Sequence, residues 1–241
     1  MAFAPLKIGR PKGVPTIKII DFTKNLMNGS KEKIMKNSKT TTLILVQFGL
    51  LLAIEAIFCF TPLGSLPALG PIVATLMMIP VIITAIMLGP TAGTLMGFFA
   101  GLFSFIVWTF IPPGPLAFVF TPFYSLGEFS GNFYSILICF VPRILAGTVT
   151  GLTYKGLSKT FPTKNVLSFS ISAVLGSFVN TFGVMGGIGL FFGKQVSSLA
   201  GEAILIIIGT TILFSGIPEA IVGAAAASAV CKPLKIILKK I

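Results

Sequence analysis

The stretch from residue 41 to residue 60, TTLILVQFGLLLAIEAIFCF, decides the fold class of this chain. It contains one charged side chain, Glu55, and is otherwise apolar except for Thr41, Thr42 and Gln47. About 20 such residues make a helix long enough to cross the hydrocarbon core of a bilayer. The whole chain has the same character, because 54% of its 241 residues are hydrophobic and 10% are charged, against about 25% charged residues in soluble domains. We therefore expect an all-α integral membrane protein.

Further apolar runs follow the first one, at 71–89, 91–111, 135–154, 165–192 and 203–231. Six spans of about 20 residues each use about half of the chain, which leaves short loops and no room for a separate soluble domain. The expected organisation is a six-transmembrane-helix bundle over residues 41–231, with a basic segment at 1–40 and a basic tail at 232–241.

The lysines and arginines are distributed unevenly between the two ends of these spans. Nine precede the first span, three lie at the fourth loop and four follow the last span, so that 16 of the 18 fall on one side. The positive-inside rule places that side, with both termini, in the cytoplasm. The net charge of +12 is then a topology signal, with a secondary attraction to anionic lipid headgroups, and does not indicate a nucleic-acid partner. The outer side holds loops 61–70, 112–134 and 193–202, where binding groups are expected.

The sequence lacks the residue patterns that are typical of metal sites, ATP sites and catalytic centres. There is no histidine, and the three cysteines have no Cys-x-x-Cys spacing, so neither a metal site nor a cofactor is expected. The run from Gly187 to Lys194 has one residue too many for a phosphate loop, and Gln195 stands where a Ser or Thr is needed. No nucleophile and base stand in a familiar arrangement. We therefore expect neither an enzyme nor an ATP site in this chain.

Three ionisable residues, Glu55, Arg143 and Glu219, fall inside predicted spans. Each costs about 2.5–3.5 kcal/mol or more at the bilayer centre, so each should face protein or water. Counting the rise of about 1.5 Å per helical residue places Glu55 and Arg143 in the outer half of the membrane, together with Asn180 and Thr181. We predict a substrate-binding pocket, open to the outside, that is lined by Arg143, Asn180, Thr181 and Glu55.

Two interpretations of Arg143 stay open at this point. Its planar guanidinium suits a clamp for a carboxylate or phosphate group of a ligand. The structural alternative is an internal ion pair with Glu55 or Glu219. Asn180 can likewise serve a ligand or a hydrogen bond between helices. Glu219 is interpreted as structural, because it lies deeper and follows Pro218, where a kink frees backbone groups.

Small residues recur at every fourth position in several spans, as at Gly89, Gly93, Gly97 and Gly101. Packing inside the bundle explains most of them, because glycine lets two helices approach closely in lipid. The first span permits a sharper interpretation, since Gly49, Ala53 and Ala56 share one helical face and Glu55 points about 120° away from it. We predict that this smooth face docks a partner helix while Glu55 looks inward. The alternative is that both sides are simply buried.

Four stretches together resemble a known family: IPVIITAIMLGP at 79–90, the run 93–104, CFVPRILAG at 139–147, and 176–193 with its Asn-Thr pair at 180–181. They are similar to the substrate-binding S components of energy-coupling factor (ECF) transporters. The resemblance implies a subunit of the bacterial plasma membrane that captures a vitamin from outside. It further implies docking on a transmembrane coupling protein that is driven by two cytoplasmic ATPases. The docking strip of the family then corresponds to Gly49, Ala53 and Ala56.

Within the family, the sequence most resembles the pantothenate branch, which implies that Arg143 faces the carboxylate of pantothenate. Riboflavin, cobalamin and folate stay open as ligands. The main alternative function is an ion-coupled secondary carrier of a small anionic metabolite, with Glu55 or Glu219 as the titrating group, although no repeat between the two halves of the chain supports it. A structural assembly subunit without a ligand is the other alternative.

Overall fold

Where the structure describes them, the apolar runs of the sequence lie in helices except for a few residues at their ends. The computed structural model describes residues 41–61, 76–161 and 165–238. The predictions for the segment 1–40, for most of the loop 61–70 and for the first part of the span 71–89 lie outside these residues. Residues 47–241 form one compact unit, and the packing described below is that of this unit.

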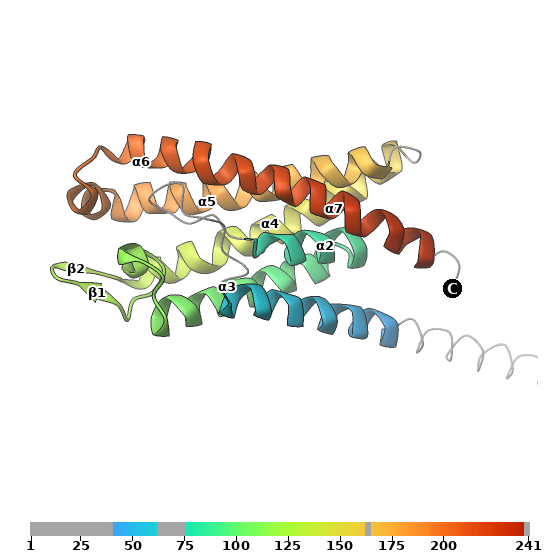
Figure 1. The fold of residues 1–241 in the computed structure, drawn as a ribbon, viewed down its shortest axis with the longest axis horizontal. Helices are drawn as coiled ribbons and strands as arrows, with labels where there is room; N and C mark the ends of the chain where they lie inside the picture. The colour runs from blue at the N-terminus through green and yellow to red at the C-terminus, as the bar shows by residue number, and fades with distance from the viewer. Residues whose placement is uncertain (1–40, 62–75, 162–164, 239–241) are drawn as a thin grey trace, which may run out of the picture. The chain divides into compact units, whose positions relative to one another are not determined.

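Within the part of the chain that the structure describes, five helices are long and apolar enough to cross a membrane by length and composition: Thr41–Phe60, Pro90–Phe110, Phe133–Thr160, Asn165–Ala200 and Ile204–Ile237. Figure 1 labels the second to fourth of them α3, α4 and α5. It labels the two parts of the last one α6 (Ile204–Thr211) and α7 (Ile217–Leu238). A single π-helical turn (Ile212–Gly216) lies between them. The expected all-α membrane architecture is confirmed. Because α2 (Met78–Leu88) is shorter than a span, the count of six crossings stays a prediction.

The turn between α2 and α3 is a single residue, Gly89, with φ +96°. A positive φ of this kind is unfavourable for side chains other than glycine. Pro90 then occupies the first turn of α3, where its fixed φ suits a helix start and its missing N–H is not needed. Gly89 and Pro90 together therefore let α3 start directly after α2.

The fifth loop differs from its expected bounds. We expected an outer loop over 193–202, but α5 continues to Ala200 and ends at Gly201, whose φ is +69°. Only Gly201, Glu202 and Ala203 then separate α5 from α6. Residues 194–200 contain neither proline nor glycine, so nothing in them stops the helix before the glycine that can adopt the left-handed conformation.

The glycines that recur at every fourth position, which we call glycine seams, pack helices against one another inside the bundle. A Cβ placed on Gly93 would lie 2.5 Å from that of Ala85, and one on Gly147 would collide with the backbone of Gly93. In the same way a Cβ on Gly183 would lie 2.9 Å from the Cβ of Pro142. These glycines bring α3 against α4 and α4 against α5, two pairs of neighbouring helices in Figure 1. The internal-packing interpretation of these seams is confirmed.

Two apolar clusters fill the interior of the unit. The first includes Met96, Ala146, Tyr154, Phe169 and Ala227. The second includes Leu116, Phe118, Phe120, Val184, Ile188 and Phe192. Residues of the loop between α3 and α4 supply part of the second cluster through the short 3-10 helix η2 (Pro115–Val119). A two-stranded hairpin of β1 (Ser125–Leu126) and β2 (Phe129–Ser130) follows in the same loop.

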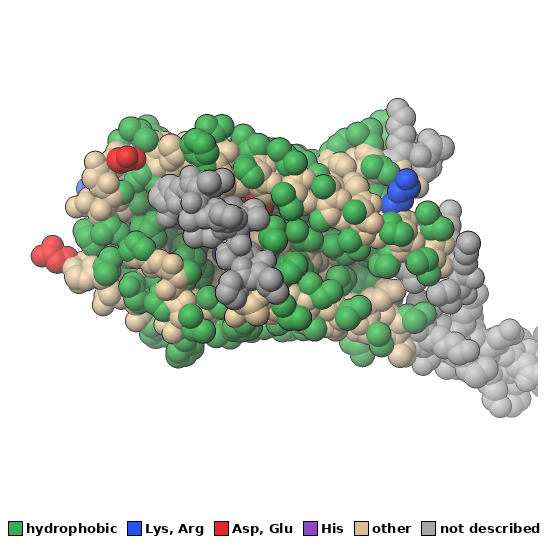
Figure 2. All heavy atoms as spheres, in the orientation of Figure 1, with side chains coloured by type: hydrophobic (Ala, Val, Ile, Leu, Met, Phe, Trp, Pro, Cys, Tyr) green, Lys and Arg blue, Asp and Glu red, His purple; other side chains and the backbone are tan. Residues whose placement is uncertain are grey.

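The outer surface of the helices is largely hydrophobic. Figure 2 shows apolar side chains along this face, with most of the visible charged side chains towards its two ends. Large exposed apolar residues such as Leu190, Leu205 and Ile221 would be unfavourable in water but suit contact with lipid tails.

Candidate ligand-binding site

The polar residues of the spans lie at the same depth along the bundle, between the two apolar clusters. We call this depth the polar level. On α4, Arg143 lies between Ile138 of the second cluster and Ala146 of the first. On α5, Asn180 and Thr181 are flanked by Val179, packed against the first cluster, and by Val184 of the second. These polar side chains therefore occupy the same gap in the apolar core.

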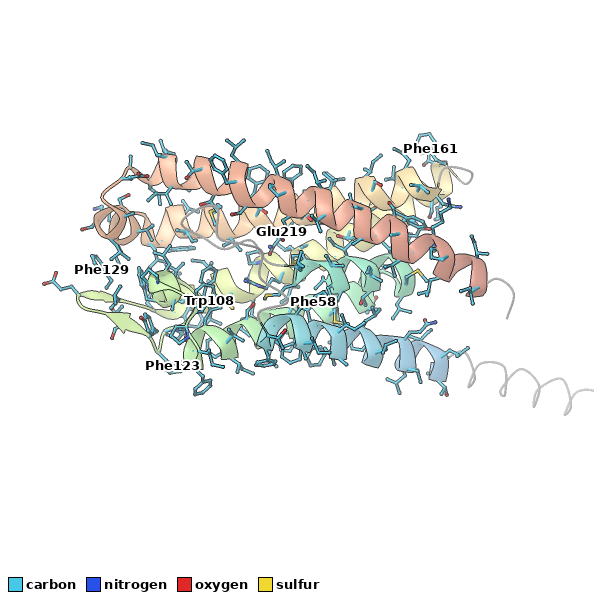
Figure 3. All side chains as sticks on the ribbon, viewed as in Figure 1. Phe58, Trp108, Phe123, Phe129, Phe161 and Glu219 are labelled. Carbon is cyan, nitrogen blue, oxygen red and sulfur yellow. The ribbon has the colours of Figure 1, made fainter. Side chains whose placement is uncertain are left out.

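Glu219 and Glu55 extend this polar level to two more helices. Along the last span, Glu219 lies between Ile212, packed against the second cluster, and Ala224, packed against the first. On the first helix, Glu55 follows Leu51 and Leu52, which pack against the first cluster. Figure 3 labels Glu219 about midway along the bundle.

Arg143 is held by its own helix. Pro142 lies inside α4 and has no N–H, so the carbonyl of Ile138 lacks its usual helical donor. Arg143 Nη1 donates to that carbonyl at 3.3 Å and to the Cys139 carbonyl at 2.7 Å. Nε and Nη2 have no hydrogen-bond partner among the described residues. Within the described residues, the guanidinium is therefore anchored through one nitrogen, and these residues leave its other donors open to a ligand.

An aromatic pair lies beside the guanidinium. The Arg143 Cζ atom is 5.8 Å from the centre of the Phe120 ring, within the range of a cation–π interaction. Phe120 is 3% exposed and stacks on Trp108 with ring centres 4.5 Å apart. Trp108 therefore belongs to the aromatic packing between α3 and the loop after it. Neither ring was among the site residues predicted from sequence, because no spacing rule links a loop phenylalanine to an arginine 23 residues later.

Glu55 is a buried carboxylate with half of its acceptors unused. The side chain is 0% exposed, and Oε1 accepts a weak hydrogen bond from Cys59 Sγ at 3.6 Å. Oε2 is buried and has no hydrogen-bond partner among the described residues. The expectation that Glu55 points into the protein is confirmed.

Two more buried oxygens at this level, Oδ1 of Asn180 and Oε1 of Glu219, accept no hydrogen bond from the residues that the structure describes. The Arg143 charge acts on both Glu55 and Glu219, but the unpartnered oxygens show that neither carboxylate is fully satisfied by it. A buried polar group without a partner costs about 1–3 kcal/mol, and more when it is charged. This arrangement favours the clamp interpretation of Arg143 over the internal ion pair.

The site as a whole offers one cation with unused donors and several acceptors around it. This set of groups fits a small ligand with a carboxylate at one end and hydrogen-bond donors along its length. Of the residues predicted from sequence, Arg143, Glu55, Asn180 and Thr181 all lie at this level of the core. Glu219 lies at this level too, although from the sequence we interpreted it as a structural residue and not as part of the pocket.

Comparison with known proteins identifies the family. The sequence matches the family described as "ECF transporter, substrate-specific component" over residues 44–234. The chain belongs to this family. It is also similar to the pantothenic acid transporter PanT of Lactococcus lactis subsp. cremoris (strain MG1363). The two are 33% identical over 164 residues, which cover 67% of this chain and 79% of the relative.

As an ECF S component, the chain is a multi-pass membrane protein that serves transport by binding substrate. The family resemblance seen in the sequence is confirmed by this match. Family membership implies a vitamin ligand and ECF partner subunits, and gives the polar level around Arg143 its role as the candidate substrate site.

One small-residue face of this S component is not used for internal packing. Gly49 and Ala53 are exposed and Ala56 is half-buried. A Cβ on Gly49 would meet nothing within 4 Å, unlike one on Gly93 or Gly147. The first helix thus has an open smooth side, while Glu55 is buried on another. The alternative that both sides are buried is wrong for this helix.

Proposed function

We propose that this S component binds pantothenate, with the carboxylate of the vitamin on the free donor edge of Arg143. The observation that carries the proposal is the guanidinium itself. It is buried to 8% exposure, anchored through Nη1, and close to acceptors for which the described residues provide no donor. The similarity to PanT supports pantothenate over riboflavin, cobalamin and folate. The chemistry of the site agrees, because pantothenate is a small carboxylate with hydroxyl and amide donors.

Calorimetric titration of the detergent-purified chain tests the ligand. We expect saturable binding of pantothenate, and much weaker binding of panthenol, which carries a hydroxymethyl group in place of the carboxylate. Arg143→Gln should weaken pantothenate by roughly 10- to 100-fold, the loss for a hydrogen bond to a charged group, and should leave panthenol unchanged. Tighter binding of another vitamin than of pantothenate would contradict the assignment.

We further propose that Gly49, Ala53 and Ala56 dock the transmembrane coupling subunit, and that two cytoplasmic ATPases supply the energy. Their exposure on a helix with no neighbour at Gly49 supports a close helix–helix contact of the kind that small residues permit. The lack of a phosphate-loop sequence in this chain is consistent with ATP hydrolysis in partner subunits. Co-purification with the coupling subunit, with and without Ala53→Leu, tests the docking face.

The proposed site opens to the outside of a bacterial plasma membrane, with both termini in the cytoplasm. The distribution of Lys and Arg supports this orientation. Labelling of a single cysteine introduced at Glu128 in a cysteine-free variant tests it in whole cells. A membrane-impermeant maleimide should react from outside, and reaction only after lysis would reverse the topology.

An ion-coupled carrier is the second candidate, because Glu55 and Glu219 provide buried carboxyl oxygens without partners that could take up a coupling ion. Uptake of pantothenate into liposomes that contain this chain alone separates the two functions. An S component should not accumulate the vitamin without ATPases, whereas a carrier should do so under a proton or sodium gradient.

A further inference from the structure

We propose that Glu219 is a ligand-binding residue that accepts hydrogen bonds from the hydroxyl groups of the ligand, so that Arg143 and Glu219 recognise opposite ends of it. The inference deepens the proposed function and rests on it. It also replaces the interpretation of Glu219 as a purely structural residue, which rested on its position after Pro218.

The backbone before Glu219 is irregular in a way that brings α7 close to the site. The π-helical turn Ile212–Gly216 interrupts the last span, and such turns often occur at functional sites. Its final residue, Gly216, lies against Thr181, because a Cβ there would be 2.8 Å from Thr181 Cγ2. Glu219 follows Gly216 by three residues, about one helical turn. The close approach at Gly216 therefore fixes Glu219 at the level next to Asn180 and Thr181.

Among the described residues around Glu219, buried hydrogen-bond acceptors outnumber the donors. Its Oε1 is buried without a hydrogen-bond partner among the described residues, and so are Oδ1 of Asn180 and Oγ of Ser177, one turn along α5. Residues 62–75, which are not described, contain no lysine or arginine. Arg143 is the cation whose charge acts on Glu219, but its Nη1 is bonded to its own helix. The described residues therefore leave Glu219 Oε1 without a donor, and a ligand can supply one.

Pantothenate has the complementary set of groups. It carries two hydroxyl donors at the pantoyl end, an amide N–H in the middle and a carboxylate at the β-alanine end. If the carboxylate binds Arg143, the hydroxyl end is left for an acceptor elsewhere at the same level. A hydroxyl that donates to a carboxylate makes a charge-assisted hydrogen bond, which is roughly twice as strong as a neutral one. Placing the carboxylate end at Glu219 would instead bring two acceptors together.

A cycle of variants and ligand analogues tests this assignment on the purified full chain. The ligands are pantothenate and N-(3,3-dimethylbutanoyl)-β-alanine, which keeps the amide and carboxylate but lacks both hydroxyl groups. We expect Glu219→Gln to weaken pantothenate by roughly tenfold or more, as for one hydrogen bond to a charged group, and to change binding of the analogue less than twofold. Arg143→Gln should weaken both ligands. Glu202→Gln, at an exposed carboxylate between α5 and α6, should change neither.

Each other outcome has a definite meaning. An equal loss for both ligands with Glu219→Gln, or no loss for pantothenate, would overturn the role of Glu219 while leaving the proposed function intact. If the unmodified chain does not bind pantothenate, the proposed function fails and this inference fails with it. If Glu219→Gln does not fold in detergent, Glu219→Asp keeps the charge, shortens the side chain by one methylene, and should show the same dependence on the ligand hydroxyls.

Discussion

Pro142 and Arg143 act as a pair: the proline leaves the Ile138 carbonyl without its helical donor, and the guanidinium of the next residue donates to that carbonyl at 3.3 Å. A proline inside a helix normally costs about 3 kcal/mol or more. Here part of that cost is offset because Arg143 gains a fixed acceptor inside an apolar environment. The arginine is positioned by a backbone defect on its own helix rather than by an acidic partner, so it stays available to an anionic ligand.

The Pro142–Arg143 pair predicts the effect of Pro142→Ala. Alanine restores an N–H that competes with Arg143 Nη1 for the Ile138 carbonyl, so the guanidinium loses one of its two anchors. We expect pantothenate affinity to fall several-fold, on the order of one neutral hydrogen bond, while thermal stability is unchanged or higher. Calorimetry and thermal unfolding in detergent measure the two effects. A variant that binds as tightly as the original chain would show that the anchor does not position the clamp.

Trp108 should report ligand binding by its fluorescence. It is the one tryptophan of the chain, and it stacks on Phe120, whose ring faces Arg143. A ligand that binds Arg143 should change the environment of this stack and give a saturable change in emission. Phe120→Leu keeps the site apolar but removes the ring, so the fluorescence change should decrease. The affinity for the ligand should also decrease, by roughly two- to fivefold for the loss of a cation–π contact. An emission spectrum that does not respond to a ligand bound in calorimetry would contradict this coupling.

Ala53→Leu should separate ligand binding from transport. The exposed alanine lies on the smooth face of the first helix, away from buried Glu55, so a larger side chain should leave pantothenate affinity within about twofold. In the complete transporter it should prevent the close helix contact that small residues permit and reduce uptake at least tenfold. Uptake assays with reconstituted subunits measure the effect.

Ala225→Leu is the matched control for this docking prediction, because it makes the same change at an exposed alanine on α7. Normal uptake by this control, together with loss in Ala53→Leu, would locate the docking face on the first helix. Equal losses in both would point to a general effect of added bulk.

Gly97→Ala should destabilise the bundle and disturb the site. A Cβ at Gly97 would lie 2.8 Å from the carbonyl carbon of Arg143 and 3.0 Å from the Ile144 Cα atom. Because both are backbone atoms, α3 must move away from α4, at a cost of about 1–3 kcal/mol, and Arg143 must move with its helix. We expect a lower unfolding temperature and weaker pantothenate binding.

Gly156→Ala provides the comparison for Gly97, since a Cβ there would meet nothing within 4 Å. This glycine lies inside α4, where alanine is favoured by about 0.5–1 kcal/mol. The unfolding temperature should therefore stay the same or rise. A Gly97 variant as stable as the Gly156 variant would mean that α3 and α4 do not pack as tightly as described.

The amino-acid sequence by itself determined that this is a helical membrane protein and which ionisable residues lie inside its apolar runs. Long apolar runs need lipid, and a charge such as Arg143 within them needs a function or a partner. Both arguments depend only on local composition, so they needed no knowledge of packing. The family resemblance also came from local motifs, and the match over residues 44–234 confirmed it.

The tertiary structure decided which of the possible partners are actually used. It left the carboxylates near Arg143 with oxygens unpartnered among the described residues and placed Phe120 beside the guanidinium. It packed Gly93, Gly147 and Gly183 between helices, while Gly49 and Ala53 stayed exposed. It also brought Glu219 to the site through a π-helical turn next to Thr181. These relations join residues far apart in the chain, and they depend on how closely helices approach, which no periodicity within one helix can determine.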